Sequence, residues 1–366
     1  MDRKHANPVG VLVIALLLVA SSPSPRELHP AFLLTWGWGV QDGSSVFQTC
    51  TSGCREGSYG SGIGQFANPK GVAIDAAGNL YVVDSQNDRI QKFDRYGKYL
   101  TSWGSSGSDE GQFGVPIGVA LDALGNVYVA DKANHRIQKF DNTGTFLLTW
   151  GWGVQNGSPV LQTCVANCQA GSAGGNVGQF DDPTYLAIDV SGVVYVADTD
   201  NHRIQKFEST GVFLDLWGAF GSGDEEFKYP MGIAIDSKDN AYVADSENYR
   251  IVKYNIDGIF LDKWGSQGIL PGELNSPVGV AVDRKGDVYV SDQVNYRMQK
   301  FSPRGELLSV WGKDGTAGGE FDYPDGVAVD ALGFIYVADY ANRRIQKFGG
   351  PWLEYYVGEL LPSRER

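Results

Sequence analysis

The feature that most constrains the fold is a pattern that occurs six times, Asp-x-x-Asn-x-Arg-Ile-Gln-Lys-Phe, with substitutions in the fourth and fifth copies. A proline lies 15 residues before each copy, and successive copies are 47 residues apart except for one step of 67. A fixed period of this length predicts one structural unit built six times rather than two or three unrelated domains. The copies span residues 84–93, 131–140, 198–207, 245–254, 292–301 and 339–348.

Within one unit the sequence predicts four short strands, at residues 71–75, 80–84, 89–93 and 98–103. Gly78 and Asn79 mark a tight turn between the first two, and the second run is rich in β-branched and aromatic residues. No unit has helical periodicity, and the 48 glycines fit many short connections. Four strands at this period indicate a four-stranded antiparallel blade of a propeller rather than a coil of a solenoid.

The repeated pattern closely resembles the NHL repeat, whose copies form six-bladed β-propellers. The resemblance covers about residues 32–348. It implies an all-β fold of six four-stranded antiparallel blades, which we place at residues 31–350.

The ring is expected to close through its N-terminal strand. Five units have a tryptophan nineteen residues after the repeat aspartate, whereas the sixth has Gly358 there. Residues 32–41 are identical to residues 146–155, which contain one of those tryptophans, so they can supply the missing strand. That pairing removes a free sheet edge. The alternative is that residues 352–358 form a local fourth strand.

The repeated polar residues are interpreted as a structural staple. Each aspartate ends a second strand, where its carboxylate can accept backbone N–H groups, the asparagine suits a left-handed turn, and the arginine can clamp the carboxylate. Six like copies favour scaffolding over catalysis, because an active site normally occurs once in a chain. The pairs are Asp84 and Arg89, Asp131 and Arg136, Asp198 and Arg203, Asp245 and Arg250, Asp292 and Arg297, and Asp339 and Arg344.

The N-terminus predicts export. Arg3 and Lys4 precede an apolar run from Val9 to Ala20, which is short for a membrane span. Residues 1–22 are therefore expected to be a signal peptide, with an uncleaved anchor as the alternative and the one route to a membrane. The protein would then be secreted or held in the cell envelope. Residues 351–366 are expected to be a C-terminal tail.

Two near-duplicate inserts, between Trp36 and Phe66 and between Trp150 and Phe180, carry the four cysteines. In an exported chain, close pairs predict two local disulfides. A zinc site shared by the two loops and free redox thiols are the alternatives. The pairs would be Cys50 with Cys54 and Cys164 with Cys168.

Positions where the repeat varies are the candidate binding residues. The residues that follow each proline should surround the channel mouth, and Tyr185 replaces a glycine of the other copies. A second variable position lies between the asparagine and the arginine of the repeat, where the candidates are His135, His202, Tyr249 and Tyr296. The residues after the prolines are Lys70, Ile117, Thr184, Met231, Val278 and Asp325.

Charge and composition limit the function. A net charge of −13 disfavours binding to nucleic acid, and therefore a function that depends on RNA. Few histidines and the lack of a Gly-x-Ser-x-Gly motif predict a propeller that is not an enzyme. We expect a monomer that binds a protein, peptide or envelope glycan through its loop face. No cofactor is expected, although a structural calcium ion is left open. The alternative is a metal-dependent lyase or hydrolase, similar to propeller lactonases and amidating lyases, with a site in the channel.

Overall fold

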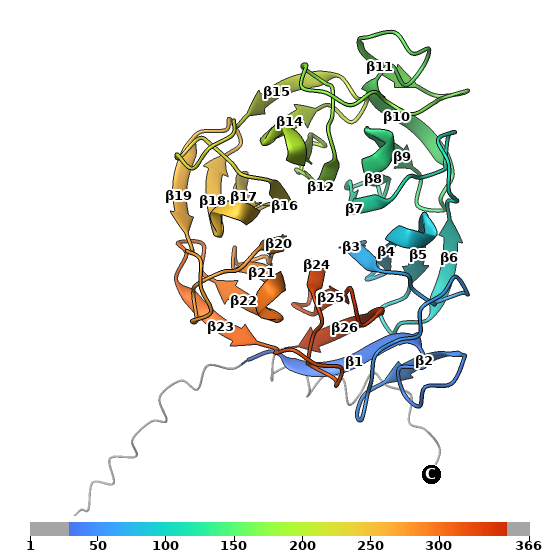
Figure 1. Cartoon of the computed structure of the whole chain (residues 1–366), viewed down its shortest axis with the longest axis vertical. Coiled ribbons are helices and arrows are strands. Elements are labelled where there is room, and N and C mark those ends of the chain that lie inside the picture. The colour runs from blue at the N-terminus through green and yellow to red at the C-terminus, as the bar shows by residue number, and fades with distance from the viewer. Residues whose placement is uncertain (1–28, 350–366) are drawn as a thin grey trace, which may run out of the picture.

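The strands form six separate sheets that stand side by side around a central axis, like the blades of a propeller (Figure 1). The computed structural model of the protein describes residues 29–349. Four of the sheets have four strands and two have five. Within each blade, the strand that begins with the repeat proline lies nearest the axis (Figure 1). The predicted six-bladed all-β propeller is confirmed.

The first three blades follow the chain in order. Between the second and third strand of each lies one 3-10 turn: η1 (Ser85–Asn87), η2 (Lys132–Asn134) or η3 (Thr199–Asn201). Blade 1 has β3 (Pro69–Ile74), β4 (Leu80–Asp84), β5 (Arg89–Phe93) and β6 (Tyr99–Trp103); blade 2 has β7 (Pro116–Leu121), β8 (Val127–Asp131), β9 (Arg136–Phe140), β10 (Phe146–Trp152) and β11 (Leu161–Cys164); blade 3 has β12 (Pro183–Ile188), β13 (Val194–Asp198), β14 (Arg203–Phe207) and β15 (Phe213–Trp217).

The last three blades repeat this order, with η4 (Ser246–Asn248) and η5 (Gln293–Asn295) in blades 4 and 5. Blade 6 is completed by strands from the start of the chain. Blade 4 has β16 (Pro230–Ile235), β17 (Asn240–Asp245), β18 (Arg250–Asn255) and β19 (Phe260–Trp264); blade 5 has β20 (Pro277–Val282), β21 (Val288–Asp292), β22 (Arg297–Phe301) and β23 (Leu307–Trp311); blade 6 has β24 (Pro324–Val329), β25 (Ile335–Asp339), β26 (Arg344–Gly349), β1 (Ala31–Trp38) and β2 (Phe47–Cys50).

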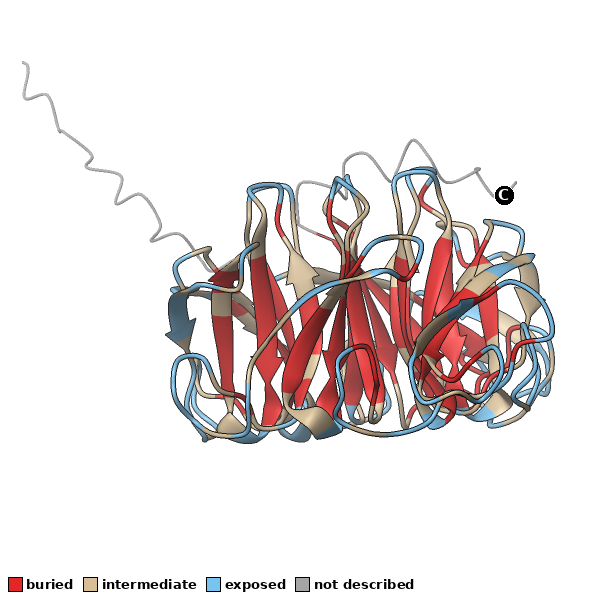
Figure 2. Cartoon of the chain, turned by 90° about the horizontal axis from the view of Figure 1, so that it is seen from above, coloured by how far each residue is buried: buried red, intermediate tan, exposed pale blue. Residues whose placement is uncertain are grey.

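Packing between blades explains the near-continuous apolar sequence of the second strands. All five residues of β8, β13 and β21 are buried, because both faces of the strand meet a neighbouring blade. Trp150 shows how the blades are joined, since its ring contacts Tyr128 of its own blade and Phe207 of the next. In the side view, buried residues fill the strands and exposed residues concentrate at the two rims (Figure 2).

Strand β1 closes the ring, as the sequence predicted. It pairs antiparallel with β26, with Ala31 opposite Gly349 and Trp36 opposite Ile345. Trp36 is fully buried, and its ring lies between Tyr336 of blade 6 and Phe93 of blade 1. The N-terminal segment therefore occupies the place that β10 has in blade 2. The rival strand at residues 352–358 lies outside the described residues.

Each cysteine-bearing insert adds a fifth strand to the outside of a blade, which the sequence did not predict. Strand β2 pairs with β1, and β11 pairs with β10, in the same register relative to the tryptophan. Beyond the new strand, each insert returns to the Asp-x-x-Asn loop of its own blade: Gly57 N–H donates to Asn342 O, and Gly171 N–H donates to Asn134 O. The inserts thus contact the loop face in blades 6 and 2.

The predicted signal peptide (residues 1–22) and tail (residues 351–366) lie outside the described residues. Within residues 29–349, no helix is long and apolar enough to cross a membrane.

Replacing Trp36 by alanine should lower the free energy of unfolding by about 3–5 kcal/mol, because it opens a cavity beside the pairing of β1 with β26, which joins the two ends of the described residues. Denaturant unfolding measures this loss. The control is Leu100→Ala on an outer strand, where the side chain is 44% exposed and the expected change is under about 0.5 kcal/mol. Equal small losses in both variants would mean that β1 does not close the ring.

Candidate functional site

The repeat aspartate is the centre of each Asp-x-x-Asn loop. In blade 1 Asp84 is fully buried and accepts four hydrogen bonds, from Ala67 N–H at 2.7 Å, Asn87 Nδ2 at 2.8 Å, Arg89 Nε at 2.7 Å and Gln91 Nε2 at 3.0 Å. The remaining Arg89 nitrogens donate to backbone carbonyls of the preceding loop. One carboxylate therefore fixes the 3-10 turn, the third strand and the loop that enters the blade.

The hydrogen bond from arginine Nε to aspartate Oδ2 recurs in all six blades at 2.7–2.8 Å. Blade 4 lacks the glutamine contact, because Val252 stands at that position. Burial raises the pKa of the Asp84 and Asp339 carboxyls, and the hydrogen-bond donors around each one oppose that shift. The left-handed residue of the loop is the one after the asparagine, for example His135 with φ of 46°, and not the asparagine that the sequence suggested. The asparagine side chain instead bonds the aspartate and a loop carbonyl.

The residues after the prolines meet in the channel, where four blades contribute to one polar cluster. Asp325 of blade 6 is 1% exposed and accepts hydrogen bonds from Lys70 Nζ at 2.9 Å, Gln293 Nε2 at 3.1 Å and the Tyr185 hydroxyl. Lys70 Nζ also lies 4.4 Å from the centre of the Tyr340 ring. The cluster occurs once and has no counterpart at the repeat positions.

Tyr185 reaches this cluster because it stands where the other five blades have glycine. A Cβ at Gly71 or Gly118 would collide with a backbone carbonyl of the next blade, so the inner strands pack closely there. In blade 3 the side chain instead crosses to blade 6, which is the opposite blade (Figure 1). Burial raises the pKa of the Tyr185 phenol well above its usual value, so it acts as a neutral donor to Asp325.

The other candidate residues of this ring are mostly structural. Ile117, Met231 and Val278 pack with Tyr185 in one apolar cluster. The Thr184 hydroxyl is buried and lies 2.6 Å from the Thr199 hydroxyl. Of the predicted ring, Lys70 therefore offers the accessible polar group, with 21% of its side chain exposed.

The second variable position faces the loop that enters the next blade. His202 Nδ1 accepts the backbone N–H of Tyr229 at 3.2 Å, and the Tyr296 ring lies 5.1 Å from that of Tyr323. A hydrogen bond with Tyr323 raises the pKa of Tyr296 to about 12. Tyr249 has the same left-handed backbone, with φ of 56°.

His135 has different neighbours from His202. Its Nδ1 lies 3.8 Å from Asp181 Oδ1, and ligand atoms of His135, Asp181 and Asp182 all lie within 4.8 Å of one another. The two carboxylates beside His135 were not predicted from the sequence. The signal was available, because only blade 3 has two acidic residues before its proline.

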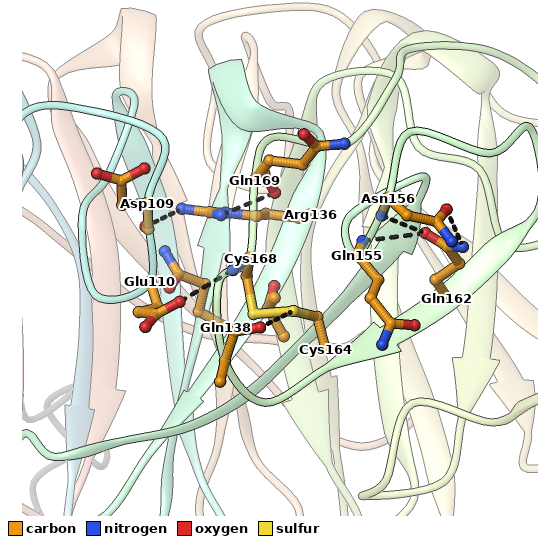
Figure 3. The surroundings of a disulfide bond; sticks show 12 residues. Asp109, Glu110, Arg136, Gln138, Gln155, Asn156, Gln162, Cys164, Cys168 and Gln169 are labelled. Carbon is orange, nitrogen blue, oxygen red and sulfur yellow. Dashed lines mark hydrogen bonds between the residues drawn. A yellow bond between two sulfur atoms is a disulfide. The ribbon is translucent and has the colours of Figure 1, made fainter.

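Both predicted disulfides are present, and the alternatives of a four-cysteine zinc site or free thiols are wrong. Cys50 is bonded to Cys54 and Cys164 to Cys168, each pair with a Cα–Cα distance of 5.7 Å. Figure 3 shows the second bond beside blade 2, where Cys168 N–H donates to Glu110 Oε2 at 2.9 Å and Gln169 O accepts from Arg136. An open cavity of about 480 Å³ lies there, lined by Asp109, Glu110, Asn167, Cys168 and Gln169.

The channel mouth opposite the Asp-x-x-Asn face has a cavity of similar volume, about 490 Å³, which the sequence did not predict. The turns between the first two strands of blades 1–3 line it. Leu124 and Val190 are 86% and 81% exposed at these turns. The aspartates beside them accept hydrogen bonds within their own turns, for example Asp122 from Leu124 N–H and Tyr128 OH.

The chain belongs to the NHL-repeat family of β-propeller proteins. The sequence profile of the NHL repeat matches residues 66–93, 113–140, 180–207, 227–254, 274–301 and 321–348. Among curated proteins, 46 residues are 44% identical to the B-box type zinc finger protein ncl-1 of Caenorhabditis elegans, and 51 residues are 41% identical to Protein brain tumor of Drosophila melanogaster. These stretches are 13% and 14% of this chain but only 5% of each relative.

Solved structures with the same fold include a gluconolactonase from Xanthomonas campestris, which is 15% identical, with 78% of this chain and 87% of that chain covered and a TM-score of 0.56. A virginiamycin B lyase from Staphylococcus aureus is 12% identical, with 77% and 95% covered and a TM-score of 0.51. A streptogramin B lyase is 14% identical, with 77% and 93% covered and a TM-score of 0.50. At these identities the likeness concerns the fold.

The comparisons contradict the prediction that the chain is not an enzyme. The solved propellers that share its fold are named for lactonase and lyase activities. The prediction relied on the scarcity of histidine. A count of histidines cannot detect a polar cluster of lysine, aspartate and tyrosine.

Replacing Arg136 by methionine should lower the free energy of unfolding by about 3–5 kcal/mol, because Asp131 would keep its buried charge without its cation. Thermal or denaturant unfolding measures this loss, and Arg304→Met, at an exposed position, is the control. A loss below about 1 kcal/mol would contradict the staple as a determinant of blade stability.

Proposed function

We propose that this protein is a lyase or hydrolase that acts on a small ester or lactone at the channel mouth on the Asp-x-x-Asn face. The observation that carries the proposal is the single cluster of Lys70, Asp325 and Tyr185, drawn from blades 1, 6 and 3. It is the polar group on this face that does not follow the repeat and that spans the channel.

Lys70 is the proposed catalytic residue. Its ammonium contacts the Asp325 carboxylate and the Tyr340 ring, and the partly exposed side chain keeps further N–H donors for a ligand. A cation fixed in this way can stabilise the oxyanion that forms when a lactone carbonyl is attacked or when an ester oxygen departs. Asp325 and Tyr185 are positioning residues, because their polar atoms are already engaged within the cluster.

The channel residues do not fit a metal ion, contrary to the metal-dependent form of this function that the sequence suggested. Asp325 is the carboxylate of the cluster, and Lys70, Gln293 and Tyr185 occupy its oxygens. Among residues 29–349, the one group of three metal-ligating side chains within reach of one another is that of His135, Asp181 and Asp182. We therefore assign no metal to the channel.

Two further observations support the proposal. The lactonase and lyase named above share the propeller fold, so the scaffold is compatible with chemistry on cyclic esters. The two disulfides suit an oxidising compartment, and we propose that the protein works outside the cytoplasm.

A panel of lactones, with gluconolactone and virginiamycin B among them, tests the activity by product formation. Lys70→Met should reduce kcat/KM about 10²–10³-fold, because the oxyanion loses its charged donor. Tyr185→Phe should reduce it less, since Asp325 keeps its other donors. Lys263→Met is the matched control, since this lysine is exposed on an outer strand and pairs only with exposed Asp224.

Turnover of no ester or lactone in the panel, or turnover that Lys70→Met leaves unchanged, would overturn the proposal.

A further inference from the structure

The junction between blades 2 and 3 brings together one imidazole and two carboxylates. His135 follows the 3-10 turn of blade 2, and Asp181 and Asp182 lie in the loop that enters blade 3. The side chains of His135 and Asp181 are 21% and 39% exposed, and that of Asp182 is 29% exposed. All three side chains are therefore partly exposed, although the atom His135 Nδ1 is itself shielded from solvent.

One nitrogen of the His135 imidazole lacks a hydrogen bond. Within the described residues, His135 Nδ1 is shielded from solvent and makes no hydrogen bond. A buried ring nitrogen without a partner costs about 1–3 kcal/mol, so it is usually satisfied by a ligand or a neighbour.

His202 provides the internal comparison, because it occupies the same position one blade later with the same left-handed backbone. Its Nδ1 accepts Tyr229 N–H, and its ring packs at 4.9 Å from Phe220 and 4.7 Å from Tyr229. A histidine at this position can therefore accept a backbone N–H from the next loop, as His202 does. His135 Nδ1 in blade 2 makes no such hydrogen bond.

We propose that His135, Asp181 and Asp182 bind one divalent transition-metal ion, for which Zn²⁺ is the probe. One imidazole nitrogen and two carboxylate oxygens leave at least one coordination position open. Metal–ligand bonds of about 2.0–2.2 Å place tetrahedral ligand atoms roughly 3.4 Å apart. The observed 3.8 Å between His135 Nδ1 and Asp181 Oδ1 requires only a small closure.

The positive charge of Lys132 should weaken the binding of a metal ion, which allows a second test of the proposal. Its Nζ lies 2.9 Å from Asp182 Oδ2, so the ammonium now neutralises one of the two ligands. A bound ion must share or displace that contact. Removing the lysine charge should therefore strengthen metal binding, which a purely structural cluster would not show.

Titration calorimetry of the full chain with Zn²⁺ alone tests the site, independently of any enzymatic activity. We expect one stoichiometric site in the unmodified protein. His135→Asn should weaken binding at least tenfold, while asparagine still tolerates the left-handed backbone. His202→Asn is the matched control and should leave the affinity unchanged.

Two further variants keep the test informative if His135→Asn folds poorly. Asp182→Asn should weaken Zn²⁺ binding at least tenfold, and Lys132→Gln should strengthen it severalfold. A protein that binds no Zn²⁺ stoichiometrically would overturn the proposal. So would equal losses in His135→Asn and His202→Asn, or unchanged affinity in both Asp182→Asn and Lys132→Gln, since these results indicate adventitious binding by an acidic surface.

Discussion

The buried pair of aspartate and arginine in each blade is the interaction on which the loop face depends. Taking both charges out of water costs several kcal/mol, and the cost is offset only because every polar atom of the pair has a partner. In blade 2, Asp131 accepts Gly114 N–H and three side-chain donors, while Arg136 donates to four carbonyls besides. One such unit fixes three segments of backbone. Because the unit is repeated around the ring, the loop face is rigid whichever side chains stand at its variable positions.

Rigid loops allow unlike side chains to stand at equivalent positions. The position after the asparagine is histidine twice, tyrosine twice, aspartate and arginine, yet its backbone is left-handed each time. The same holds at the inner strands, where Lys70 and Asp325 replace apolar residues and Tyr185 replaces glycine without loss of the strand register. The Asp-x-x-Asn face therefore consists of a repeated scaffold and two non-repeated groups, the Lys70 cluster and the His135 group.

The sequence predicted what is periodic or duplicated. The blades follow from the repeat, and the closure by β1 follows because residues 32–41 copy residues 146–155. Contacts between blades far apart in the chain left no such signal. Tyr185 and Asp325 are separated by 140 residues, and Lys70 and Asp325 by 255, so neither hydrogen bond could be derived from spacing. The fifth strands β2 and β11 were missed because four-residue strands in loops rich in glycine and serine have little pattern of their own.

We propose that chemistry takes place at the channel mouth on the Asp-x-x-Asn face and not at the opposite mouth, where the cavity lined by Leu124 and Val190 lies. A crystal structure of the protein with the lactam analogue of a lactone that it turns over would locate the site. We expect the analogue on the Asp-x-x-Asn face, with its carbonyl oxygen within hydrogen-bond distance of Lys70 Nζ. An analogue bound in the opposite cavity, with the Lys70 cluster untouched, would contradict this proposal.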